Sequence, residues 1–379
     1  MRMTVACAGH AAPHAGWAAI DELADLLVHY FDATLLSPRR VERRWPWPRS
    51  GRSAWQRLDS DGGDVLFVVA HAPQDLAMID AIPDARRRFG RIVAWVTDSY
   101  FEGGFGPATA QYDGITVTAP EDQAHPRQRF GIPVHQVYQG VDGLAWAPRQ
   151  STPRAIDLIG FGRMPASYHA HFARRFHGAQ SPALYLHSPL GHVTGPDVHL
   201  ERGMLFKLLH RASVSLAFHL FVEPEGQRPR SMMVTSRWLE SLVSGCVVAG
   251  RRPVSTMADE MLAWPGATLE LGDDPRDAGD QLLALLAQGD ALEAQRHLNV
   301  QQTLLRHDWR HRIVQMCACF GLPVPPALAG DIAGLQDLAA CWGRGAAPLD
   351  AGVSSARGGR GEPPGSGPTR SPTPALHAA

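Results

Sequence analysis

The chain carries almost no net charge and almost no lysine. Its 379 residues include 36 basic and 37 acidic side chains, for a formal charge of −1. A protein that binds nucleic acid over a broad surface carries a basic excess, so this balance argues against a nucleic-acid partner. Lys207 is the one lysine, and the abundance of arginine and alanine is typical of a GC-rich genome. The length is sufficient for two domains of ordinary size.

Paired cysteines are also lacking. The five cysteines are odd in number and form no Cys-x-x-Cys pair: Cys7, Cys246, Cys317, Cys319 and Cys341. Cys317 and Cys319 stand two apart in an expected helix, which directs them to different faces. The eighteen histidines lack paired spacing with other ligand types. We therefore expect neither a disulfide framework nor a bound metal, and a reducing cytoplasm as the setting.

No apolar run approaches the roughly 20 residues that a membrane-spanning helix requires. The longest runs, such as residues 65–70, have the length of a buried strand. The apolar N-terminus is interrupted by His10, Pro13 and Asp21, which is typical of a strand and a helix and not of a signal peptide. We expect no membrane span and a cytoplasmic location. Residues 343–379 are rich in Gly, Pro, Ser, Arg and Ala, which predicts a disordered tail.

Short apolar strands alternate with amphipathic helices along both halves of the chain, which predicts an α/β protein. Polar side chains follow the expected strands of the first half: His10 and His14 in one loop, His71 and Asp98 in two others. Ligands of open α/β sheets bind beyond the carboxyl ends of the strands. Asp98, His10 and His71, with His14 beside them, are therefore candidate catalytic residues.

Residues 235–250 combine a short amphipathic helix with a buried strand. Trp238, Leu239, Leu242 and Val243 share one face of the helix. Thr235 or Ser236 can cap its start, and Gly245 can end it in the left-handed conformation. Arg237 and Glu240 fall on the opposite face. A helix N-terminus that carries an arginine suits a nucleotide diphosphate, and Glu240 can accept hydrogen bonds from ribose hydroxyls.

This segment resembles the donor-binding helix of the group 1, two-domain glycosyltransferases, specifically those of the bacterial spore-protein type. Three further segments are similar to that family and occur in its order. They are the run 115–142 that ends in Gly-Val-Asp, the strand and Gly-x-Gly turn at 156–163, and the aromatic and arginine pattern at 307–312. The resemblance covers roughly residues 65 to 322.

The resemblance implies the GT-B architecture, in which two Rossmann-like domains face a central cleft. It places an N-terminal acceptor domain at 1–148, a C-terminal donor domain at 153–322 and the tail at 343–379. It implies a metal-independent transfer of a sugar from a nucleotide-diphosphate sugar to a small-molecule, glycan or protein acceptor, with no cofactor. The residues expected to bind the donor are Gly162, Arg163, His219, Arg228, Arg230, Ser231, Ser236, Arg237 and Glu240.

One feature of the family is missing. Many retaining members have two glutamates with seven residues between them. Glu240 matches the second, but Met232 occupies the position of the first, and the nearest earlier acidic residues are Glu223 and Glu225. The sequence therefore leaves open whether the sugar linkage is retained or inverted. A non-catalytic protein that binds a sugar nucleotide or glycan, and a sugar-nucleotide epimerase or phosphorylase, are the alternatives that share the fold.

Overall fold

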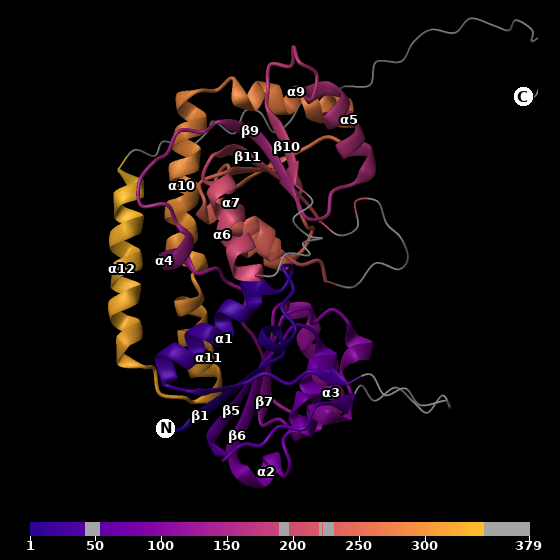
Figure 1. Cartoon of the computed structure of the whole chain (residues 1–379), viewed down its shortest axis with the longest axis vertical. Coiled ribbons are helices and arrows are strands. Elements are labelled where there is room, and N and C mark those ends of the chain that lie inside the picture. The colour runs from indigo at the N-terminus through magenta and orange to yellow at the C-terminus, as the bar shows by residue number, and fades with distance from the viewer. Residues whose placement is uncertain (42–53, 189–196, 220–221, 223–230, 345–379) are drawn as a thin grey trace, which may run out of the picture.

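The computed structural model describes residues 1–41, 54–188, 197–219, 222 and 231–344 (Figure 1). Two of the expected donor residues, Arg228 and Arg230, lie outside the described residues, as do Glu223 and Glu225. The expected tail at 343–379 lies outside them as well, except for its first two residues. In the part of the chain that the structure describes, no helix is long and apolar enough to cross a membrane.

The first domain is built on a six-stranded parallel sheet with the strand order β2-β1-β5-β6-β7-β8. Residues 65–70 and 92–96 of its two longest strands are apolar and buried, as parallel strands covered by helices on both faces must be. The strands of this sheet are β1 (Met3–Cys7), β2 (Thr34–Leu36), β5 (Gly63–Ala70), β6 (Phe89–Val96), β7 (Gly114–Val117) and β8 (Val134–Gln136). A small antiparallel pair, β3 (Arg40–Val41) and β4 (Ala54–Trp55), stands apart from it.

Helices and short turns connect these strands. The α-helices are α1 (Ala18–Phe31), α2 (Ala85–Arg88), α3 (Ala124–Phe130) and α4 (Gly143–Trp146). The 3₁₀ turns are η1 (Gly9–Ala11), η2 (Pro73–Ala81), η3 (Glu102–Gly104), η4 (Pro107–Gln111) and η5 (Pro120–Gln123). The helix α1 places Leu23 and Leu27 against β1 and β5, in a cluster that fills one face of the sheet.

The second domain is a five-stranded parallel sheet with the order β10-β9-β11-β12-β13. Its strands are β9 (Ile156–Phe161), β10 (Tyr185–Ser188), β11 (Ala212–Phe218), β12 (Val247–Arg251) and β13 (Thr268–Glu270). Its helices are α5 (Ala166–Phe176), α6 (Val198–Leu209), α7 (Ser236–Val243), α8 (Thr256–Met261), α9 (Pro275–Leu286) and α10 (Asp290–His307). The two facing Rossmann-like domains have the GT-B architecture, so the expected fold class is confirmed (Figure 1).

After the second domain, the chain returns to the first. The helix α11 (Trp309–Phe320) packs on the first sheet, where the rings of Trp309 and Trp95 meet edge to face at 5.4 Å between centroids. Trp309 Nε1 also donates to the carbonyl of Ala19 in α1, at 3.2 Å. The second domain was expected to extend to residue 322, but α11 packs with the apolar cluster of the first sheet.

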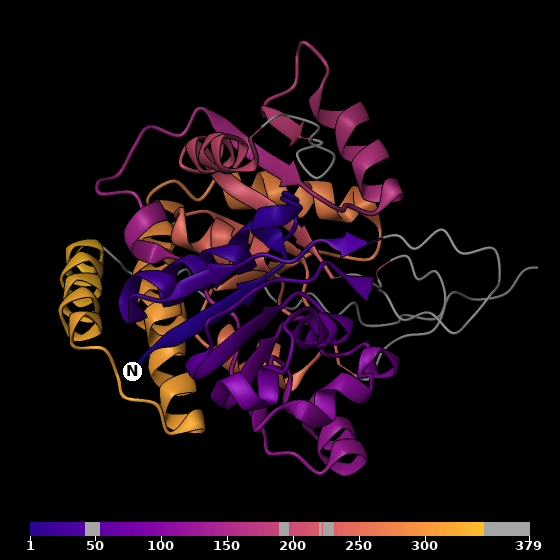
Figure 2. The ribbon, with the colours of Figure 1, turned by 60° about the horizontal axis from the view of Figure 1, so that its bottom comes forward.

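A last helix, α12 (Pro326–Gly343), runs along the edge of the molecule and contacts both domains (Figures 1 and 2). Near its start, Leu328 belongs to the apolar cluster of the first domain. Near its end, Leu335 and Trp342 pack in the cluster of the second domain, and Trp342 Nε1 donates to the carbonyl of Pro148 at 3.0 Å. Gly343, expected to begin the tail, is the last residue of this helix.

Candidate functional site

In both sheets the strand order reverses beside the first strand, between β1 and β5 and between β9 and β11. In doubly wound sheets these are the positions where the connecting helices leave toward opposite faces and open a space for a ligand. His10 and His71 follow β1 and β5 in the first domain. Arg163 and His219 follow β9 and β11 in the second. The strand order therefore explains why residues predicted from strand ends gather at the same edge of each sheet.

Asp98 lies in the loop that follows β6 of the first sheet. Its backbone N–H donates to the carbonyl of His71 at 3.1 Å, which joins the loops after β5 and β6. Burial raises the pKa of the Asp98 carboxyl to about 7, while the charge of Arg163 in the second domain opposes the rise. His71 also lowers this pKa and Asp75 raises it further. Asp98 is thus a partly buried acid whose pKa is raised to about 7.

Gly162, Arg163 and Arg237 lie together in the second domain and form a cationic corner. Arg237 Nη1 donates to the carbonyl of Arg163 at 2.6 Å. Gly162 has a φ of +66°, and a Cβ at this position would lie 2.6 Å from Arg237 Nη2. Glycine is therefore needed both for the turn and for the approach of the guanidinium. Burial and the neighbouring Arg163 lower the pKa of Arg237 to about 10. Within the described residues, neither guanidinium forms an ion pair with a carboxylate.

The predicted helix over residues 235–243 is confirmed as α7, with Ser236 as its first residue. Its N-cap residue Thr235 makes no side-chain capping hydrogen bond. The first N–H groups of α7 therefore have no side-chain acceptor at the cap, as suits an anion-binding helix end. Gly245, with a φ of +76°, follows the end of the helix as predicted.

Glu240 lies in a buried ion cluster. It accepts a hydrogen bond from Arg202 of α6, and Arg202 also binds Glu22 of α1 through two guanidinium nitrogens. Glu22 further accepts from Trp146 Nε1 at 2.6 Å. Burial raises the pKa of Glu22 to about 7, although the charge and the hydrogen bonds of Arg202 lower it. Glu240 was expected on an exposed polar face of α7, but it is buried. Through Arg202 it is linked to Glu22 of the first domain. Neither Glu22 nor Arg202 belongs to a recognisable motif, so sequence reasoning missed both.

Ser231 and His219 both form hydrogen bonds within the protein. Ser231 Oγ donates to Asp122 Oδ1 at 2.8 Å, and Ser99 Oγ donates to the other oxygen of the same carboxylate at 2.6 Å. Ser231 therefore joins the two domains through Asp122. The backbone N–H of His219 donates to the carbonyl of Arg251 at 3.0 Å, which extends the pairing of β11 with β12.

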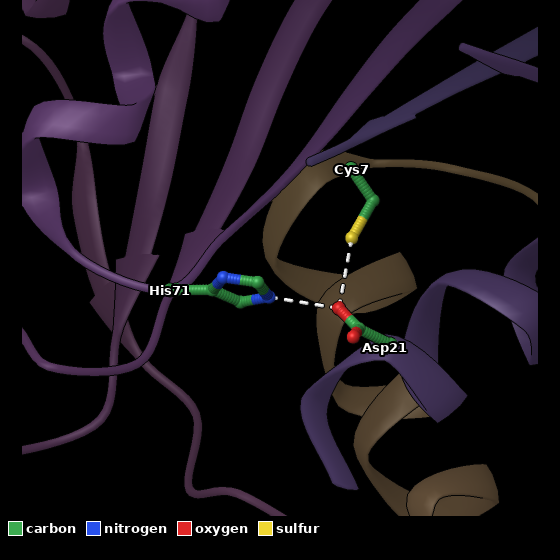
Figure 3. Close-up of side chains that lie close together, drawn as sticks. All are labelled: Cys7, Asp21 and His71. Carbon is green, nitrogen blue, oxygen red and sulfur yellow. Dashed lines mark hydrogen bonds and ion pairs between the residues drawn. The ribbon is translucent and has the colours of Figure 1, made fainter. Parts of the chain in front are cut away.

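His71 is part of a second polar cluster, drawn in Figure 3, with Asp21 and Cys7. His71 Nε2 donates to Asp21 Oδ1 at 2.8 Å, and Cys7 Sγ donates to the same oxygen at 3.3 Å. Burial and the charge of Asp21 raise the pKa of Cys7 well above its usual value, so its sulfur stays protonated. The ring of Trp17 stacks on the imidazole of His71 with 4.8 Å between centroids.

The other two histidines of the first loop have local partners. His10 Nε2 lies 2.7 Å from Asp25 Oδ1, and this hydrogen bond raises the pKa of His10. His14 Nδ1 accepts from the backbone N–H of Gly16 at 3.1 Å. The structure therefore joins His71 and Asp98 through adjacent loops but pairs His10 with a half-exposed carboxylate of α1.

Cys7, Asp21 and His71 also form the one group of three potential metal ligands within the described ranges. Their ligand atoms all lie within 4.8 Å of one another. Hydrogen bonds to a single carboxylate oxygen account for this convergence, since the thiol and the imidazole both donate to Asp21 Oδ1.

Comparison with known proteins gives one match to a family model. Residues 170–318, which are less than half of the chain, match the model described as "Glycosyl transferase-like". The comparison with curated proteins returned no match. The spore-protein-like subfamily is not distinguished by these matches.

The comparison with solved structures returned TarM, AviGT4 and a beta-glucosyltransferase among its matches. A point mutant of S. aureus TarM, in complex with Fondaparinux, alpha-GlcNAc-glycerol and UDP, is 9% identical over 68% of this chain and 55% of that chain, with a TM-score of 0.42. AviGT4, a glycosyltransferase involved in Avilamycin A biosynthesis, is 15% identical over 87% of this chain and 98% of that chain, with a TM-score of 0.44. A DNA-modifying beta-glucosyltransferase is 10% identical over 85% of this chain and 100% of that chain, with a TM-score of 0.42. The chain thus spans about half the length of TarM, and these likenesses concern the fold alone.

Proposed function

We propose that this protein is a metal-independent glycosyltransferase of the spore-protein-like type. It moves a hexosyl or related group from a nucleotide-diphosphate sugar to a small-molecule, glycan or protein acceptor. The donor binds the second domain and the acceptor binds the strand ends of the first. The observation that carries the proposal is the meeting of Arg163 and Arg237 at the start of α7, where Arg237 Nη1 donates to the carbonyl of Arg163 at 2.6 Å. In the first domain, burial raises the pKa of the Asp98 carboxyl to about 7, and the charge of Arg163 lowers it.

The cationic corner suits the leaving group of such a reaction. When the glycosidic bond breaks, the nucleotide diphosphate gains negative charge, and its stabilisation is the main catalytic task. Arg163, Arg237 and the N-terminus of α7 are fixed donors at one place. Fixed donors of this kind supply about 3–4 kcal/mol each in a closed site. They supply the positive charge that Mg²⁺ provides in other sugar transferases, so no metal is required.

The test is incubation with UDP-, GDP- and dTDP-linked hexoses, with free diphosphate followed by mass spectrometry. Parallel reactions receive a cell extract as the source of acceptor. We expect release from one donor class, and faster release with the extract. Arg237→Ala should slow it strongly, while Arg174→Ala, which removes an exposed arginine of α5, should not. No release from any donor would contradict the proposal.

A non-catalytic sugar-nucleotide-binding protein is the second candidate, and Met232 favours it by occupying the position of the missing glutamate. Calorimetry with the same nucleotide sugars separates the two. Donor binding without diphosphate release, in the presence of extract, would support the binding protein and contradict the transferase.

A further inference from the structure

Phe101 is an exposed aromatic side chain in the loop that follows β6 of the first sheet. Its exposed fraction is 49%, and within the described ranges every other Phe, Tyr and Trp side chain is buried or half-buried. A single exposed hydrophobic side chain is ordinary in folded proteins, so its place in the fold decides whether it has a role. Phe101 stands at the edge of the sheet where His71 and Asp98 also lie, which is the edge where α/β proteins bind their ligands.

The ring of Phe101 is held in place by its neighbours. It contacts the ring of Tyr100 with 4.2 Å between centroids and a tilt of 38°. Tyr100 packs in turn against an apolar cluster whose members come from both domains. The N–H of Phe101 donates to the carbonyl of Asp98 at 3.3 Å, and its carbonyl accepts from the N–H of Gly104 at 2.8 Å. A ring fixed in this way loses little conformational entropy when a ligand binds to it.

The loop that carries Phe101 is linked to the segment that leads into α7. Ser99 Oγ donates to Asp122 Oδ2 at 2.6 Å, and Ser231 Oγ donates to the other oxygen of this carboxylate at 2.8 Å. Ser99 lies just before Phe101 in the chain, and Ser231 lies just before Ser236, the first residue of α7. Phe101 therefore lies beside the junction between the two domains, on the side of the first domain.

The surroundings of Phe101 combine aromatic rings with a hydrogen-bond acceptor. Trp17 and His71, whose rings stack with 4.8 Å between centroids, belong to the loops after β1 and β5, so aromatic rings follow three adjacent strands. The partly exposed carboxyl of Asp98 has no hydrogen-bond partner within the described residues. A pyranose ring has the matching chemistry, because its C–H face is apolar and its hydroxyls, which can donate to a carboxylate, line the rim.

We propose that Phe101 is the stacking platform for the acceptor, and that the acceptor is a saccharide whose apolar ring face lies on this side chain. The proposal rests on the proposed function and narrows the acceptor from a small molecule, glycan or protein to a sugar ring. The negative face of an aromatic ring attracts the C–H groups of the sugar, and both apolar surfaces leave water. Phe101 is thus a residue that selects the acceptor and transfers no proton.

Direct binding of saccharides to the full-length protein tests the platform without requiring turnover. The probes are the α- and β-methyl glycosides of glucose, galactose, mannose and N-acetylglucosamine, each with UDP, GDP or dTDP present. Saturation-transfer-difference NMR reports which protons of the glycoside touch the protein. We expect at least one glycoside to bind, with the strongest saturation on the C–H groups of one ring face. Absence of binding by every glycoside would overturn the proposal.

Variants of Phe101 separate stacking from a simple apolar contact. Phe101→Ala should weaken the binding of that glycoside about tenfold or more, because the exposed half of the ring is what the sugar covers. Phe101→Tyr keeps a flat ring and should retain the affinity, whereas Phe101→Leu keeps an apolar side chain without a ring and should lose it. Wild-type affinity in Phe101→Leu would overturn the stacking. Wild-type affinity in Phe101→Ala, with the fold intact by circular dichroism, would remove Phe101 from the acceptor site.

Val324→Ala is the matched control. Val324 has the same exposed fraction of 49% and lies in the turn between α11 and α12, away from the strand ends. In steady-state kinetics, Phe101→Ala should raise the KM for the glycoside about tenfold, and Val324→Ala should not change it. Hydrolysis of a nucleotide sugar by a wild-type protein that binds no saccharide would overturn this proposal and leave the proposed function in place. Absence of release from every nucleotide sugar would overturn the proposed function, and with it the acceptor role of Phe101.

Discussion

Replacement of Arg202 by methionine should destabilise the folded chain strongly, because Arg202 compensates two buried carboxylates. It binds Glu22 of the first domain and Glu240 of the donor helix, and both carboxylates are largely shielded from solvent. Removing one partner of a buried ion pair costs about 3–5 kcal/mol, since the remaining charge is left without compensation. Methionine retains much of the volume, so loss of packing adds little.

The loss should depend on pH in a defined direction. The pKa of Glu22 is raised from 4.5 to about 7 by burial even with Arg202 present. When a carboxyl has a higher pKa in the folded than in the unfolded protein, its contribution to the free energy of unfolding is complete below the unfolded pKa. That contribution is lost as the pH rises through the folded pKa. Without Arg202 the folded pKa rises further. Arg202→Met should therefore lose more stability at pH 8 than at pH 5.5, where Glu22 holds a proton in the variant.

The assay is urea unfolding followed by tryptophan fluorescence at the two pH values. Arg252→Met is the matched control, because Arg252 pairs with the exposed Asp259 at 2.6 Å, and such surface pairs are worth about 0–1 kcal/mol. Adding Glu22→Gln to Arg202→Met should recover part of the loss. A loss for Arg202→Met no larger than that of the control, at both pH values, would refute the account of the ion cluster.

Three further outcomes are expected. Arg237→Ala should weaken nucleotide diphosphate binding by about 1.5–3 kcal/mol, the value of a charge-assisted hydrogen bond, and calorimetry that finds the affinity unchanged would remove Arg237 from the donor site. Trp342→Ala should lower the free energy of unfolding by about 3–5 kcal/mol, because the ring is buried and its Nε1 donates to Pro148; an unchanged urea midpoint would contradict the docking of α12. Turnover should survive excess EDTA, and activity that is abolished by EDTA and restored by Mg²⁺ or Mn²⁺ would overturn the metal-free proposal.

Local pattern was enough to predict much of the donor side. The helix α7, its glycine stop and the following strand come from the spacing of apolar side chains, which reports on helical and extended periods directly. The positions of His71 and Asp98 also followed from pattern, since a polar residue after a buried strand must lie at a sheet edge.

The partners of these residues did not follow from pattern. Glu240 was expected to be free for a ribose, but it lies against Arg202, which is 38 residues away in the chain. Ser231 was expected beside phosphate, and its hydroxyl is bound to Asp122, 109 residues away. The family resemblance placed the helix over 309–320 within the domain 153–322, yet its apolar face packs on the first sheet.

The sequence by itself therefore determined the class of fold, the order of the elements and which residues stand at strand ends and helix starts. These are properties of neighbours within a few residues, and periodicity and capping record them. The tertiary structure alone decided that Asp21 orients His71 over 50 residues of separation and that Glu22 meets Arg202 over 180. Such pairs depend on how two sheets and a returning helix pack together, because a side chain acquires its partner, its burial and its pKa only when distant segments exclude water around it.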